Sequence, residues 1–344
     1  MEQKIKKLLQ NNATRAMFLC LAVSVVMSFV ADGFMSAKNI SNILKTTSMY
    51  TAVALAQLVL LSIGQFSLAL APMGILSAMV CAVLTQVYNC PPIIAAAACI
   101  ATGTLLGFIH GTVTARTGLN PFIVTLAFQS IFQGLAIALL QGKQLAYMPQ
   151  AIMNINKLGL LNVNGSPLLP YIFILAAVCL VLVYLLYRKT SLGHKLLLVG
   201  DSKRAAEIAG IKPKNIITAA YTINGFLVGV AGLMGAARFG GAPLTMGTDW
   251  VLFAFAGSVL GGTLLTGGKV NVIGAFFGSL MLQLTNYSLQ FLRTPAYWTQ
   301  TILGCILVLI FSMDYIQGRL ALRASMKASE KEFKLAAEKK GGSV

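Results

Sequence analysis

The segment RKTSLGHKLLLVGDSKRAAEIAGIKPK (Arg188–Lys214) is polar and basic, and it separates two long apolar segments. It carries seven Lys or Arg residues against two acids, Asp201 and Glu207. Asp201 and Ser202 are typical N-cap residues, alanines follow them, and Gly210 is a typical helix stop. A helix of about nine residues is too short to be stable alone in water. We therefore expect it to lie against a partner, the alternative being a solvated loop that only sets topology.

The composition of the whole chain is that of an integral membrane protein. Hydrophobic residues make up 57% of the 344 residues, and charged residues only 10%, whereas soluble domains carry about 25% charged residues. We expect an all-α, polytopic membrane fold. The net charge of +17 is gathered beside apolar segments, without interleaved aromatic residues. This pattern favours anionic lipid as a partner and argues against nucleic acid.

Spanning helices need about 20 mostly apolar residues. Ten segments meet this pattern, although the eighth is short and the second and third are nearly fused. The expected spans are 16–31, 47–63, 66–88, 92–114, 122–141, 168–187, 216–237, 250–264, 271–289 and 297–316. The sequence thus predicts a transmembrane domain over 16–316, flanked by tails at 1–15 and 317–344.

The distribution of Lys and Arg predicts the orientation. An even number of spans places both termini on one side, and 20 of the 26 cations then share that side. The positive-inside rule makes this side the cytoplasm. We expect both termini and the 188–214 loop to lie on the cytoplasmic side of the membrane. The longest outside loop, 142–167, contains turn signals such as Asn164-Gly165.

The cysteines and histidines predict no metal site and no catalytic site. All six cysteines except Cys90 fall in apolar segments, where they act as small hydrophobic residues. His110 and His194 lie far apart in the sequence without acidic neighbours. The GGTLLTGGK segment lacks the Walker spacing, with Thr263 where a glycine is required. We expect a chain that is not an enzyme and binds no ATP or Mg²⁺ itself.

Charges are nearly absent from the expected spans, which argues against proton or ion coupling. Uncharged amides are present, and they suit a hydroxylated, uncharged solute because each offers donors and an acceptor. Gly64, Ser67 and Pro72 predict a broken stretch near Gln65. The alternative role of each amide is packing between helices. The candidate residues of a solute path are Gln65, Phe66, Ser67, Asn120, Phe122, Gln129, Gln133, Asn224 and Asn286.

Three stretches carry a family resemblance: LGHKLLLVGDSKRAAEIAGI, AGSVLGGTLLTGGKVNVIGAFFGSL and NPFIVTLAFQSIFQGLA. With them the chain, over roughly 15–316, resembles the membrane permease subunit of bacterial ABC importers of the ribose and simple-sugar type, autoinducer-2 permeases included. The resemblance implies cytoplasmic ATPase subunits that bind ATP and Mg²⁺, an external solute-binding protein and a second permease in a homo- or heterodimer. It also implies a coupling helix, with candidate residues Gly200, Asp201, Lys203, Arg204, Ala206, Glu207 and Gly210.

One departure from that family concerns the broken stretch. The family commonly has a GGxDLSVG segment, but here the carboxylate position is Gln65 and two glycines are absent. Two explanations remain open: a degenerate half of a permease pair, or a different solute. Other classes also remain open, namely a permease for nucleosides or branched-chain amino acids, an ion-coupled secondary carrier, and a membrane scaffold or receptor.

Overall fold

The computed structural model describes residues 12–30, 33–140, 148–163, 166–295, 298–302, 304–305, 308 and 312. The chain divides into two units, Met1–Arg293 and Thr294–Val344. The expected tail 317–344 and residues 1–11 lie outside the described residues, and the first described helix already begins at Asn12.

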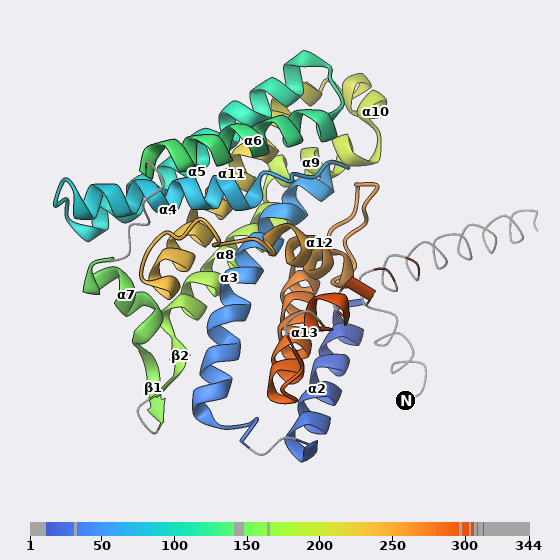
Figure 1. Ribbon diagram of the computed structural model, residues 1–344. Helices are drawn as coiled ribbons and strands as arrows, with labels where there is room; N and C mark the ends of the chain where they lie inside the picture. Colours follow the sequence, from blue (N-terminus) through green and yellow to red (C-terminus); the bar gives the residue numbers. More distant parts are fainter. Residues whose placement is uncertain are drawn as a thin grey trace, which may run out of the picture. The chain divides into compact units, whose positions relative to one another are not determined.

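The first unit holds the following elements (Figure 1): α2 (Asn12–Val30), α3 (Ala37–Ser62), α4 (Leu70–Gln86), α5 (Pro92–Thr117), α6 (Pro121–Leu140), α7 (Gln150–Lys157), β1 (Gly159–Val163), β2 (Ser166–Pro170), α8 (Tyr171–Lys189), α9 (Ser191–Asp201), α10 (Lys203–Ile208), α11 (Pro213–Phe239), α12 (Trp250–Leu260) and α13 (Val272–Phe291).

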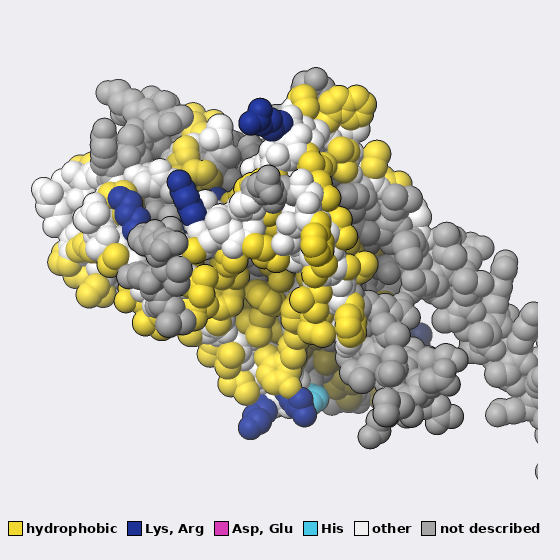
Figure 2. All heavy atoms as spheres, turned by 90° about the horizontal axis from the view of Figure 1, so that it is seen from below, with side chains coloured by type: hydrophobic (Ala, Val, Ile, Leu, Met, Phe, Trp, Pro, Cys, Tyr) yellow, Lys and Arg dark blue, Asp and Glu magenta, His cyan; other side chains and the backbone are white. Residues whose placement is uncertain are grey.

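The helices confirm the polytopic, mainly helical membrane class. Six of the described helices are long and apolar enough to cross a membrane, and α2, α4 and α12 contain shorter apolar stretches. They correspond to nine of the ten expected spans, while the tenth, 297–316, is described only in part. Ten spans therefore stays a prediction. Figure 2, which looks at this unit from below, shows many hydrophobic side chains on the described surface.

Several expected boundaries were wrong. The second span starts at Ala37 rather than 47, because Ser36 caps it and Thr46 and Ser48 bond back to the preceding turn. The third starts at Leu70 rather than 66, and the eighth ends at Leu260 rather than 264. Polar residues in the first turns of α3 lower the local hydropathy, so an apolar window detects this helix too late.

The structure also contains a β-ladder that the expected all-α class did not include. Strands β1 and β2 pair antiparallel, with Gly159 opposite Pro170 and Val163 opposite Ser166. This hairpin lies in the expected outside loop, at the end of the unit opposite α10 in Figure 1. Because 166–170 pairs as a strand, the following helix begins at Tyr171 rather than 168.

Two helix sets meet at the buried helix α3. It packs against α8, α11, α12 and α13, and α11 packs most extensively against α5. The α5–α11 contact is a backbone approach: a Cβ atom at Gly103 would lie 2.6 Å from the Gly225 carbonyl oxygen, and one at Gly107 would lie 2.8 Å from the Gly225 Cα. Small residues spaced by four positions permit this close packing.

Candidate functional site

The broken stretch between α3 and α4 is confirmed as residues 63–69. Gly64 adopts φ +66°, and a Cβ atom there would lie 2.9 Å from the Thr266 carbonyl oxygen, so both conformation and space require glycine. Gln65 is buried, and its Oε1 has no hydrogen-bond partner among the residues that the structure describes. The non-helical backbone of this stretch leaves backbone N–H and C=O groups without helical hydrogen bonds inside the unit. Membrane proteins tolerate such backbone only where protein or a water-filled cavity surrounds it.

Thr125 of α6 anchors this stretch, and the sequence did not single it out. The Leu68 amide donates to Thr125 Oγ1 at 2.9 Å, and the Ser67 hydroxyl lies 3.0 Å from the same oxygen. On the other side, the Ser67 amide donates to Gln57 Oε1 at 3.4 Å. A threonine near the start of an apolar helix carries no distinctive sequence signal, so only the fold identifies this link.

We expect Thr125→Val to loosen the broken stretch and reduce uptake several-fold. The change keeps the side-chain volume but leaves the Leu68 amide without its acceptor, at a cost of about 1–3 kcal/mol. Thr117→Val is the matched control, because its hydroxyl donates to the Val113 carbonyl oxygen and accepts from the Leu119 amide at an exposed helix end, where water can replace both bonds. Uptake of labelled solute into cells measures both variants, and equal uptake by the two would contradict the role of Thr125.

Aromatic side chains bring two of the candidate path residues together. The ring centroids of Phe66 and Phe122 lie 5.9 Å apart, and those of Phe66 and Phe255 lie 5.2 Å apart. Phe255 of α12 was not among the expected residues. The broken stretch, the start of α6 and α12 therefore meet at one aromatic contact.

The other α6 candidates lie along its exposed side. Asn120 caps the helix, since its Oδ1 accepts from the Phe122 amide at 2.9 Å. Phe122, Gln129 and Gln133 follow at spacings of seven and four, which places them on one stripe. Gln129 is exposed and Gln133 half-buried, while the opposite side of α6 packs inward through residues such as Phe128 and Phe132.

Asn224 and Asn286 lie elsewhere. Asn224 is fully buried and donates through Nδ2 to the Ala56 carbonyl oxygen of α3 at 2.8 Å, which is a contact between helices. Asn286 accepts from Gln290 Nε2 at 3.2 Å on the last turns of α13. The structure thus gathers Gln65, Phe66, Ser67 and Phe122, and places these two amides at other points of the unit.

The expected helix 201–210 is divided in the structure. Asp201 ends α9, and Ser202 caps α10 by accepting from the Ala205 amide at 3.2 Å. Gly210 ends the segment at φ +76°. Ala206 is buried, whereas Lys203, Arg204 and Glu207 are exposed. Ile208 is 83% exposed, which leaves an apolar side chain on the surface of this short helix.

Gly200, at the end of α9, touches the end of α3. A Cβ atom at Gly200 would overlap the Ser62 carbonyl oxygen and lie 2.7 Å from the Gly268 nitrogen. The Gly268 amide donates to that same Ser62 oxygen at 3.0 Å. Tyr187 of α8 donates to Ser62 Oγ at 2.9 Å. The basic loop, the α12–α13 turn and the residue before the broken stretch therefore form one contact.

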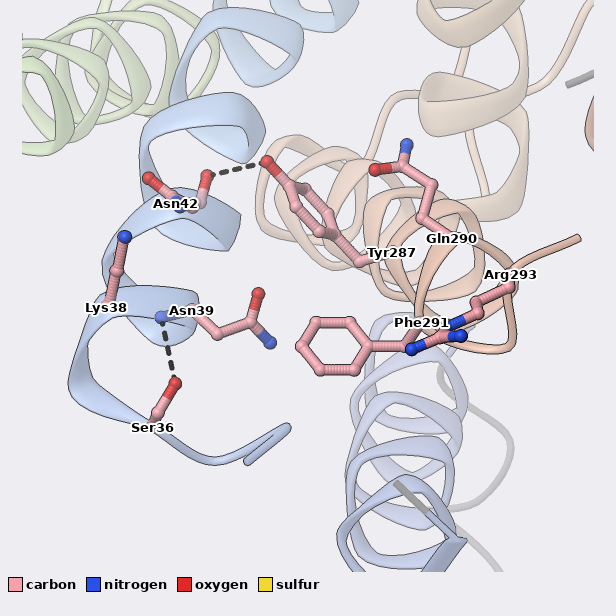
Figure 3. Close-up of a pocket in the computed structure, with 8 residues that line it drawn as sticks. All are labelled: Ser36, Lys38, Asn39, Asn42, Tyr287, Gln290, Phe291 and Arg293. Carbon is pink, nitrogen blue, oxygen red and sulfur yellow. Dashed lines mark hydrogen bonds between the residues drawn. The ribbon is translucent and has the colours of Figure 1, made fainter. Parts of the chain in front are cut away.

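A separate cavity of about 650 Å³ lies between the first turns of α3 and the last turns of α13 (Figure 3). In Figure 3, Lys38 and Asn42 line one side, and Gln290 and Arg293 the other. Among the described residues, its lining holds amides, two cations, a hydroxyl, a tyrosine and a phenylalanine, but no carboxylate. The lining residues are Ser36, Lys38, Asn39, Asn42, Tyr287, Gln290, Phe291 and Arg293.

Comparison with known proteins identifies the family of this chain. A family model described as "Branched-chain amino acid transport system / permease component" matches residues 39–311. The chain belongs to this permease family. The matched region contains the broken stretch, helices α4 to α13, and α3 from its third residue onward. No solved structure matches the chain.

Curated relatives of the permease span nearly its whole length. The fructose import permease protein of Rhizobium meliloti is 26% identical and covers 91% of this chain and 88% of the relative. The D-allose transport system permease protein of Escherichia coli (strain K12) is 26% identical, covering 86% and 89%. The galactose/methyl galactoside import permease protein of Haemophilus influenzae is 28% identical, covering 90% and 95%. The expected resemblance to sugar-type importer permeases is confirmed, and the chain is a membrane permease component rather than an enzyme.

Proposed function

We propose that the permease forms the translocation path for a sugar or sugar-like solute in an ATP-driven importer of the bacterial inner membrane. Its partners would be cytoplasmic ATPase subunits, which bind ATP and Mg²⁺, an external solute-binding protein and a second permease. The fructose, allose and galactose import permeases among the relatives support a sugar over a nucleoside or a branched-chain amino acid. The near absence of charge in the spans supports ATP-driven over ion-coupled transport.

The contact of Gly200 with Ser62 carries the coupling part of this proposal. The exposed face of α10, with Lys203, Arg204, Glu207 and Ile208, would dock on an ATPase subunit. Movement of that helix reaches α9 directly, and α9 ends against the residue that precedes the broken stretch. A rigid connection of packed backbone transmits displacement between two sites. The path itself would include Gln65, Phe66 and Ser67, together with the α6 stripe, which consists of Phe122, Gln129 and Gln133.

The α6 stripe supports a dimer of two permeases. Gln129 is an exposed amide on a mainly apolar helix, and an amide is costly against lipid. Facing a second permease across a solute path would remove that cost. We place the path at the axis of such a dimer, with both termini and the 188–214 loop in the cytoplasm.

Affinity purification from the native membrane, followed by mass spectrometry, tests this proposal. We expect an ATPase with Walker motifs to accompany the permease, and a second permease to reveal whether the pair is a heterodimer. A thermal-shift screen of sugars against the accompanying binding protein identifies the solute. Purification of the permease alone, under conditions that preserve complexes, would support an ion-coupled carrier instead.

Glu207→Lys tests the docking assignment. The variant reverses the charge on the exposed face of α10 without touching buried groups, so we expect a loss of uptake with normal membrane insertion. Glu207→Gln, which only removes the charge, should lose less. Uptake and ATPase recovery in pull-downs measure the effect. Normal uptake by Glu207→Lys would count against docking through this face.

A further inference from the structure

A narrow apolar groove lies beside the polar cavity of Figure 3. Helices α2, α3 and α13 wall it, and its volume is about 450 Å³. Ser24 is the single polar residue among the twelve that line it. Its walls include Cys20 and Leu21 of α2, Ile40 and Leu44 of α3, and Phe277 and Leu280 of α13.

The groove and the polar cavity adjoin along the same helices. Phe34 lines the groove and Phe291 lines the cavity, and their rings meet edge to face with centroids 5.5 Å apart. On α13 the lining changes from Leu280 and Leu284 to Tyr287 and later residues. The two spaces thus lie next to each other along α3 and α13, with the Phe34–Phe291 contact between them; the groove is apolar and the cavity at the helix ends is polar.

The polar end of this site is cationic. Lys38 and Arg293 are both exposed there, and the eight residues that line the cavity include no carboxylate to balance them. The remaining lining offers neutral donors, among them the side-chain NH2 of Asn42 and the second N–H of Gln290, whose Nε2 also donates to Asn286 Oδ1. Such an end attracts an anion that also carries oxygen acceptors.

The position of the site matches the depth of a lipid. The cavity lies where α3 begins and α13 ends, opposite the end that carries α9 and α10 (Figure 1). The ends of apolar spanning helices lie at the head-group level, and the groove beside them lies among acyl chains. An open apolar groove at that depth fills with hydrocarbon, because empty space there loses packing contacts.

We propose that the groove and the cavity together bind one phospholipid with an anionic head group. One acyl chain occupies the groove between α2 and α3. The phosphate lies between Lys38 and Arg293, and the amides of Asn42 and Gln290 meet the remaining oxygens of the head group. Since α2 packs chiefly on α13, the lipid supplies the contact between α2 and the first turns of α3.

Lipid retention tests the proposal. The intact chain is reconstituted in vesicles of equal phosphatidylglycerol and phosphatidylcholine, extracted in detergent and examined by native mass spectrometry. We expect one phosphatidylglycerol per chain. Lys38→Gln/Arg293→Gln should lower its retention at least fivefold without lowering that of phosphatidylcholine. Lys157→Gln/Arg116→Gln, which removes two exposed cations outside the site, should leave retention unchanged.

A second variant separates the groove from the head-group end. Leu280→Trp adds bulk to the groove wall, so retention of phosphatidylglycerol should fall although both cations remain. Equal retention by the wild type and the Lys38/Arg293 variant would overturn the proposal, as would equal retention of the two lipids by the wild type. Thermal stabilisation that follows added sugar rather than phosphatidylglycerol, and is lost in the Lys38/Arg293 variant, would instead make the cavity a solute site.

Discussion

Gly200→Ala is expected to lower coupled uptake at least tenfold. The added Cβ atom overlaps the Ser62 carbonyl oxygen and lies 2.7 Å from the Gly268 nitrogen, and neither backbone atom can rotate away as a side chain would. The end of α9 must move off α3, or the Gly268–Ser62 hydrogen bond must break. Overpacking of this kind costs about 1–3 kcal/mol, and a factor of ten corresponds to about 1.4 kcal/mol.

The readouts for this variant distinguish lost coupling from lost folding. We expect the purified Gly200→Ala complex to keep its ATPase subunits, because α10 is unchanged, while solute-stimulated ATP hydrolysis and uptake in vesicles fall. Gly134→Ala is the matched control, since a Cβ atom at Gly134 meets nothing within 4 Å. Wild-type uptake by Gly200→Ala would show that this contact transmits nothing.

Gly107→Ala is expected to have the largest effect on stability. A Cβ atom there overlaps the Tyr221 carbonyl oxygen and lies 2.8 Å from the Gly225 Cα, so α5 and α11 must separate. Separation would expose the interface between α5 and α11, the most extensive helix–helix interface of the unit. We expect the free energy of unfolding to fall by about 1–3 kcal/mol. Gly107→Val should lower the free energy of unfolding further, because the two methyl groups of the valine side chain would also meet α11.

Thermal unfolding in detergent measures this loss. We expect the midpoint of Gly107→Ala to fall by several degrees, and the level of protein in the membrane to fall with it. Gly134→Ala, on the outward side of α6, should match the wild type. Unchanged unfolding of Gly107→Ala would mean that α5 and α11 are not held by this backbone contact.

Much of the helical architecture could be predicted because its signals are local. Apolar runs indicated nine spans that correspond to described helices, and Ser202 and Gly210 marked the segment that contains α10. The errors have local causes too: Lys38 and Asn42 lower the hydropathy of the start of α3, and the strand at 166–170 continues directly into α8.

The candidate site was less accessible to such reasoning. Gln65 and Ser67 were singled out from helix breakers and polar groups, and the structure places Phe66 of the same stretch against Phe122, another candidate. Thr125, Gln57 and Phe255 were missed, because a threonine, a glutamine and a phenylalanine inside helices look the same whether they anchor a broken stretch or fill a core.

The sequence by itself determined that this chain is a polytopic membrane permease with a basic loop and a break after its second helix. Hydropathy, caps and charge bias act over one or two helical turns, so they can be read along the chain. Only the tertiary structure decided that Gly200 meets Ser62, that Gly107 meets Gly225, and that Lys38 and Arg293 line one cavity. These pairs are far apart in sequence, and their approach depends on how whole helices pack.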